Sequence, residues 1–228
     1  MASDEGAATI AARAELRVTI EQYGEKSSES VEARMAVAEA LIAEHRYSTS
    51  IPELVEAGKL SEELFGVHSW ETLMPAQRLG YVLFQMGKFD KAVGVYRRLL
   101  AQTIQAWGAE SSNALIVLRD LDVSLVRTRS TSEIEVTGMD VVNAHLAAER
   151  PAASAELPVI YQLGGIYRRF SSQTCAVCLY RRALNGCVAG RTRPNIAMKC
   201  FLGILIALPG TFLEREKQGA SGSGTPSE

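Results

Sequence analysis

"GVHSWETLMPAQRLGYVLFQMGKFDKAVGVYRRLL", residues 66–100, decides the fold of this chain. Apolar residues recur at spacings of three and four on both sides of Gly87-Lys88, as Leu79 and Leu83 do before it and Phe89 and Val93 do after it. This spacing is typical of one face of an α-helix, and the strict alternation of a β-strand is absent. The stretch therefore predicts two antiparallel helices joined by a short turn.

Parts of this hairpin return at a fixed interval along the chain. Gly164 follows Gly80 at the same interval at which Tyr180 follows Tyr96. Half of that interval, 42 positions, separates three aromatic–glycine pairs, at 23–24, 65–66 and 107–108. A period of 20–50 residues indicates a solenoid built from one repeated unit. We therefore predict an all-α fold, an α-solenoid of antiparallel helical hairpins.

The motif residues of the opening stretch resemble the tetratricopeptide repeat (TPR), in particular the 42-residue subtype of kinesin light chains and many fungal repeat proteins. The resemblance covers about residues 20–208. It implies a right-handed superhelix in which the first helix of each hairpin lines a concave groove. The unit at 118–159 departs from the pattern, since Ile134 and Gly138 stand where alanine and tyrosine are usual. The matching residues are Thr72-Leu73, Leu79-Gly80, Gly87-Lys88-Phe89, Ala92 and Tyr96-Arg97-Arg98.

The period gives a map of one array over residues 1–208, with repeats at about 34–75, 76–117, 118–159 and 160–201. We expect Gly80 and Ala92 where the two helices of a hairpin approach closely, and left-handed caps at Gly24, Gly66 and Gly108. The tail 214–228 is rich in glycine, serine and charge, which is typical of disorder. The expected helices are 7–22, then the pairs 30–46 with 51–64, 69–86 with 89–106, 111–129 with 132–148 and 156–170 with 172–188, and a closing helix at 195–208.

The resemblance also implies which side chains bind a partner. Positions on the first helices would face the groove, where related repeats often carry asparagines that hydrogen-bond an extended peptide. Gln162 can play that role because an amide both donates and accepts. Arg78 and Asp120 each offer one kind of group, so we expect them to pair with each other or with neighbours. The predicted partner-binding residues are Gln77, Arg78, Tyr81, Arg119, Asp120, Tyr161, Gln162 and Arg168.

Charge is unevenly distributed. The net charge is −2, which argues against a nucleic-acid partner. Residues 1–75 hold fourteen acids and six bases, a net of −8, whereas residues 157–213 hold seven bases and no acid. This basic end suits an acidic protein or peptide.

No apolar run reaches the roughly 20 residues that span a bilayer, and the N-terminus lacks a signal-peptide pattern, so we expect a cytoplasmic protein with reduced thiols.

The sequence predicts neither a cofactor nor a catalytic or metal site. Cys175 and Cys178 form a CxxC, with Cys187 and Cys200 beyond it, but the pair falls inside an expected helix rather than in a zinc-type turn. The function that the repeat favours is a scaffold or adaptor for a protein or peptide partner. The alternative is an enzyme or small-molecule receptor that uses the groove as a pocket.

The closing stretch "IAMKCFLGILIAL", residues 196–208, is apolar apart from Lys199. A terminal repeat normally needs a polar outer face, and exposed apolar strips mark interfaces. We therefore expect this segment to bind a partner's helix or a second copy of the chain, unless Phe212 and Leu213 fold back over it.

Overall fold

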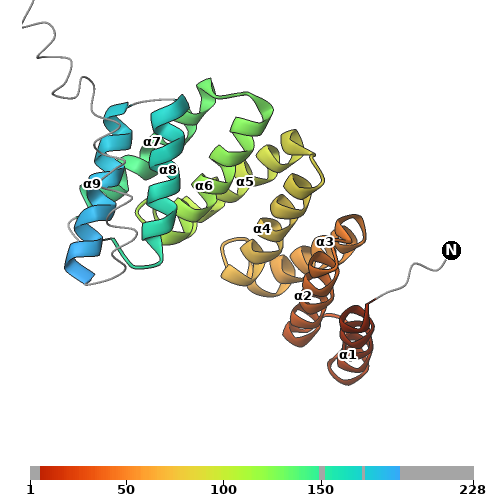
Figure 1. Ribbon diagram of the computed structural model, residues 1–228. Helices are drawn as coiled ribbons and strands as arrows, with labels where there is room; N and C mark the ends of the chain where they lie inside the picture. The colour runs from red at the N-terminus through yellow and green to blue at the C-terminus, as the bar shows by residue number, and fades with distance from the viewer. Residues whose placement is uncertain (1–5, 149–151, 171–172, 191–228) are drawn as a thin grey trace, which may run out of the picture. The chain divides into compact units, whose positions relative to one another are not determined.

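The computed structural model describes residues 6–148, 152–170 and 173–190, and within those ranges it contains helices and no strand (Figure 1). The chain divides into two compact units, residues 1–130 and 131–228, which are described separately. The first unit contains α1 (Ala7–Tyr23), α2 (Ser28–Ala43), α3 (Tyr47–Phe65), α4 (Trp70–Gln85), α5 (Phe89–Trp107) and α6 (Ser112–Thr128). The second contains α7 (Ser132–Ala147), α8 (Glu156–Phe170) and α9 (Gln173–Gly190).

The helices follow the predicted map closely. The largest difference is α3, which begins at Tyr47 rather than at the expected residue 51. Pro52 therefore lies inside the helix. The turn before α3 is closed by backbone bonds, with the Arg46 N–H donating to the Leu41 carbonyl at 2.8 Å. The expected closing helix at 195–208 and the tail at 214–228 lie outside the described residues.

The turns within the first three hairpins share one backbone geometry. His45, Gly87 and Arg129, which occupy the same position in successive repeats, all have positive φ, at 57°, 72° and 62°. After each of them, the next N–H donates to a carbonyl five residues back, a Schellman-type helix end. Only one of the three positions carries the glycine that this conformation favours.

Arg129→Gly is therefore expected to raise stability by about 0.5–1 kcal/mol, because it removes the steric cost of a left-handed side chain but adds unfolded-state entropy. Thermal unfolding by circular dichroism measures the change. Arg129→Ala is the control, since alanine keeps the strain and should give no gain. Equal melting temperatures for the glycine and alanine variants would contradict this account of the turn.

The joints between hairpins are also repeated. Our prediction of left-handed caps at Gly24, Gly66 and Gly108 is wrong in detail, because these residues have φ of 82–87° but ψ of 160–166°. That region is open essentially to glycine alone. Three residues after each glycine, a serine hydroxyl accepts the N–H that caps the next helix, at Ser27, Ser69 and Ser111.

Each of two hairpins is held by one close approach. A β-carbon built on Gly80 would lie 2.6 Å from Cζ of Tyr96, and one on Gly164 would lie 2.7 Å from Cε1 of Tyr180. The three atoms nearest to the Gly80 position all belong to Tyr96, so the tyrosine ring is packed more tightly there than Ala92. Glycine is required at this position because the ring fills the space of a side chain.

Asp122 breaks this pattern in the first unit. It takes the place of Gly80 and Gly164 in the repeat that lies between theirs. Its side chain is fully buried, and neither carboxylate oxygen has a hydrogen-bond partner among the described residues. Burial raises the pKa of the Asp122 carboxyl well above its usual value. The core of α6 therefore contains a carboxyl that is unfavourable in its ionised form.

Candidate functional site

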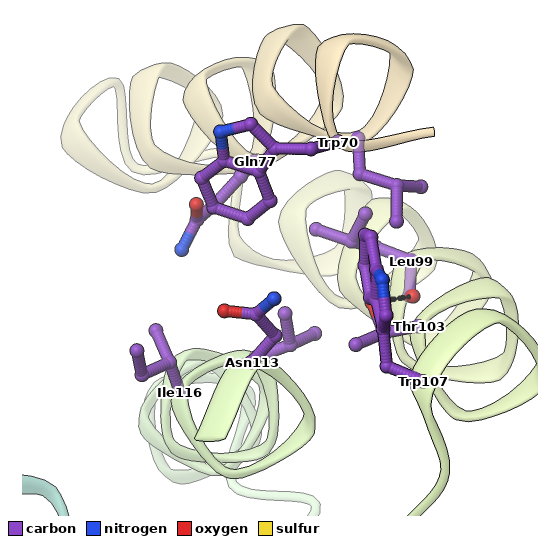
Figure 2. Close-up of a pocket in the computed structure, with 9 residues that line it drawn as sticks. Trp70, Gln77, Leu99, Thr103, Trp107, Asn113 and Ile116 are labelled. Carbon is purple, nitrogen blue, oxygen red and sulfur yellow. Dashed lines mark hydrogen bonds between the residues drawn. The ribbon is translucent and has the colours of Figure 1, made fainter. Parts of the chain in front are cut away.

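We call the first helix of each hairpin a first-type helix and the second a second-type helix. A small pocket lies between the first-type helices α4 and α6 (Figure 2). The second-type helix α5 contributes the rest of the wall. The volume of the pocket is about 50 Å³. The α4 side chains follow a helical spacing, so they share one face of that helix. The lining residues are Trp70, Leu73 and Gln77 from α4, Leu99, Thr103 and Trp107 from α5, and Asn113, Ile116 and Val117 from α6.

Both tryptophans of the chain line this pocket. Trp70 opens α4 and Trp107 closes α5, and their rings meet edge to face with centroids 6.2 Å apart. Trp70 is 45% exposed, although a tryptophan is large and mainly apolar. An exposed aromatic beside an apolar hollow is a common contact for a binding partner.

Amide groups face the same space. Figure 2 shows Gln77 on the α4 side and Asn113 on the α6 side, both beside the pocket. The Gln77 Nε2 donates to Asp120 Oδ2 at 3.4 Å, a long hydrogen bond that a better acceptor could replace. Two amides can each donate to and accept from an extended backbone. The pocket thus combines apolar walls with groups that suit a peptide.

Three of the predicted groove residues of the first unit, Arg78, Arg119 and Asp120, are ion-paired. Arg119 binds Asp120 through both Nε, at 2.9 Å, and a terminal nitrogen, at 2.6 Å. Arg78 instead pairs with Glu39 of α2, Nε to Oε1 at 2.6 Å. Gln77, Arg119 and Asp120 therefore form one cluster. Arg78 and Asp120 do not pair with each other; each pairs with a different neighbour.

Tyr96 is influenced by this polar cluster. Burial raises the pKa of its phenol far above the usual value, and the negative charge of Asp120 raises it further. The phenol therefore stays neutral in any ordinary buffer. Tyr81, also predicted for the groove, lies on the same helix as Gly80 and is exposed.

The remaining predicted residues lie on α8, in the second unit. Tyr161 is half-buried, with its ring centroid 5.6 Å from that of Tyr180. Gln162 and Arg168 are exposed. Their role in binding stays a prediction, as does that of the first-unit cluster.

Of the lining residues, sequence reasoning predicted only Gln77 for the site; Trp70, Trp107 and Asn113 are the aromatic and amide residues that it missed. A signal was present, because these are the chain's two tryptophans and an asparagine at the start of a first-type helix. Trp70 also lies seven residues before Gln77, which places both on one face of α4. The family analogy pointed instead to positions farther along the same helices.

Other candidate chemistry finds little support in the described ranges. There, no three His, Cys, Asp or Glu side chains are grouped as a metal site would require. Cys175 and Cys178 are half-buried on α9, whereas the Cys187 side chain and Cys200 lie outside what is described. The described helices include none with the length and apolar character needed to cross a bilayer.

The fold is a TPR-like helical solenoid, as its structural neighbours show. The crystal structure of BtubC (BKLC) from P. vanneervenii matches with a TM-score of 0.69 at 14% identity, over 99% of this chain and 96% of that one. A kinesin light chain protein of Podosopora anserina with nearly identical TPR-like repeats matches with a TM-score of 0.64 at 12% identity, and a substituted form of it with 0.65 at 12%. These two cover 81% of this chain and 88% and 87% of their own.

No family model matches the sequence, and no curated protein matches it either. At 12–14% identity the neighbours establish the fold alone. They confirm the predicted all-α repeat architecture and the TPR resemblance. The function has to be argued from this chain's own groove.

Proposed function

We propose that this chain is a protein-interaction scaffold that binds an extended segment of a partner across the first-type helices α4 and α6. The observation that carries the proposal is the pocket between Trp70 and Trp107, with the Gln77 and Asn113 amides beside it. A side chain of the partner would enter the pocket, and its backbone would hydrogen-bond to the amides.

The size of the pocket favours a peptide over a small molecule. Pockets that enclose small ligands usually measure about 300–1,000 Å³. The volume here is about 50 Å³, enough for a small aliphatic group and not for a cofactor. A partner that contacts a long surface and inserts one small apolar residue is consistent with this geometry. This pocket is therefore too small for the alternative of an enzyme or receptor that encloses a small molecule in it, although hollows of about 390 and 400 Å³ lie elsewhere on the first unit.

Charge suggests an acidic segment in that partner. Arg78 and Arg119 lie beside the groove, and a carboxylate of the partner could compete with their present partners Glu39 and Asp120. Arg168 is exposed on α8 of the basic C-terminal part. We extend the proposal to a protein partner rather than nucleic acid, to a cytoplasmic setting, and to a second docking region at residues 196–208.

The tryptophans provide a direct test. Because both line the pocket, peptide binding there is expected to change the intrinsic tryptophan emission of the full chain. Peptides selected from a random 12-residue display library would be titrated while emission is recorded. Trp70→Ala is expected to weaken the selected peptides by about 10-fold or more, the usual loss for an aromatic anchor.

Phe65→Ala is the matched control. Phe65 is the aromatic residue 42 positions before Trp107, it is 39% exposed, and it does not line the pocket. Its removal should leave peptide affinity unchanged. Selected peptides that bind Trp70→Ala as tightly as the unmodified chain, without changing its emission, would place the binding site elsewhere.

A further inference from the structure

A larger hollow, of about 390 Å³, lies among α3, α4 and α5 of the first unit. Its apolar floor includes Leu54 of α3 with Pro75 and Leu79 of α4, and its edges carry charged side chains of α3 and α5. It shares no lining residue with the pocket between the two tryptophans. The hollow is therefore a separate feature, on a different face of α4.

The equivalent place one repeat earlier, between α1 and α2, is filled by side chains. Leu16 of α1 is buried in one core cluster with Ala33 of α2. Ile20, one turn after Leu16, packs against the same cluster. A leucine and an isoleucine thus close the contact between this second-type helix and the first-type helix that follows it.

In α3 both of these side chains are missing. Gly58 stands 42 positions after Leu16, and Glu62 stands 42 positions after Ile20. Both of these α3 residues line the hollow. A β-carbon built on Gly58 would meet one atom within 4 Å among the described residues, Cβ of Pro75 at 3.7 Å. The hollow thus occupies the space that a leucine side chain takes up in the preceding repeat.

The apolar pair returns in the next repeat. The residues 42 positions after Gly58 and Glu62 are Leu100 and Ile104 of α5. Leu100 is buried and Ile104 is half-buried, and so the repeats on both sides of the hollow have the same two aliphatic residues at these positions. Within the first unit, the gap is therefore particular to the contact between α3 and α4.

Charge differs between the two edges of the hollow. On the α5 edge Arg98 is exposed, and it makes no ion pair or hydrogen bond with the residues that the structure describes. On the α3 edge Lys59 pairs with Glu56 of its own helix, Nζ to Oε2 at 3.4 Å, and Glu62 adds a negative charge. A carboxylate of a partner is therefore favoured at the α5 edge.

We infer that this hollow binds an aliphatic side chain of a protein partner, with an acidic residue of the same segment paired to Arg98. The groups missing from α3 are aliphatic side chains, and a partner's leucine or isoleucine would restore the packing of the neighbouring repeats. The hollow also has room for the partner's adjoining backbone. Anchors that fill a pocket in this way contribute much of the affinity of an interface. The inference goes beyond the proposed function, because it adds a second contact surface that is independent of the groove.

Filling the hollow tests the inference. Peptides would be selected from a random 12-residue display library on the full chain carrying Trp70→Ala, which removes the groove anchor. The selected peptides are expected to contain an aliphatic residue near Asp or Glu. Gly58→Leu should weaken them about 10-fold or more, the usual loss for an anchor. It should also keep or raise the melting temperature, because leucine favours a helix and its β-carbon makes an ordinary contact with Pro75.

Gly94→Leu is the matched control for packing, since Gly94 of α5 is exposed and does not line the hollow. Arg98→Ala should weaken the same peptides several-fold, and its control is Arg97→Ala, an exposed neighbour that does not line the hollow either. Both controls should leave peptide affinity unchanged.

Three results would each overturn the inference. The first is a set of selected peptides that all bind Gly58→Leu as tightly as its parent. The second is an equal loss of affinity in a hollow variant and in its control. The third is displacement of the peptides by free leucine at the same concentration, which would indicate a small-molecule site. Tryptophan emission with groove peptides should be the same for Gly58→Leu and the unmodified chain, so failure here and failure of the groove proposal are distinguishable.

Discussion

Gly80→Leu is expected to destabilise the first unit by about 1–3 kcal/mol or more, the usual cost of overpacking a core. A β-carbon alone would come within 2.6 Å of the Tyr96 ring, which is itself buried and cannot move into solvent. For a chain of this size the melting temperature should fall by roughly 2–4 °C for each kcal/mol. Thermal unfolding of the purified variant measures the change.

Gly94→Leu provides the control within the same hairpin. Gly94 lies in α5, is exposed, and has open space where a β-carbon would be. Leucine favours a helix more than glycine does, so this variant should melt at the same temperature or higher. If Gly80→Leu melted like Gly94→Leu, the glycine–tyrosine contact would not be the close approach of the hairpin. Truncation of Tyr96 to alanine in the Gly80→Leu background should recover part of the loss.

Asp122→Asn is expected to stabilise the protein at neutral pH and to lose that advantage in acid. Burial alone raises the pKa of the Asp122 carboxyl, and no charged group offsets it. The folded state therefore binds a proton more tightly than the unfolded state. Between the unfolded and the folded pKa, the unmodified chain loses about 1.4 kcal/mol of stability for each pH unit that the pH rises.

The way in which the stability difference between Asp122→Asn and the unmodified chain changes with pH distinguishes the cost of burying a charge from an effect of packing. Below the unfolded pKa, near 3.8, both states are protonated and the carboxyl costs nothing in charge. Above the folded pKa the penalty is complete and the stability difference between the two proteins becomes constant. Urea unfolding of both proteins from pH 4 to pH 8 measures the difference. A difference that does not change with pH would mean that Asp122 is ionised in both states or in neither.

The helices could be predicted from the sequence because a repeat shows the same apolar spacing several times. The ends of α1, α3 and α5 were marked by a glycine, and the period predicted how the helices pair into hairpins. Asp122 could not be predicted as a buried acid from its own neighbours. Only its place in the register, one repeat after Gly80 and one before Gly164, shows that it occupies a core position.

The groove was predicted less completely than the fold. Gln77, Arg119 and Asp120 do come together, because the period places their helices side by side as successive first-type helices. The pocket needs side chains from three helices. Its two tryptophans lie at the ends of their helices, where the repeat motif does not indicate which way a side chain points. Arg78 pairs with Glu39, a choice that depends on side-chain reach rather than on sequence spacing.

The joints between hairpins have a consequence for how such a chain can change in length. At Gly24, Gly66 and Gly108 the backbone follows nearly the same path, and serines at the same offset begin the next helix. Each joint is closed by hydrogen bonds among residues no more than six positions apart. A copy of residues 67–108 inserted after Gly108 would therefore meet a compatible junction at both ends. Tandem duplication or loss of a whole 42-residue module is accordingly a route by which a gene for this chain could lengthen or shorten its groove while every remaining junction is kept.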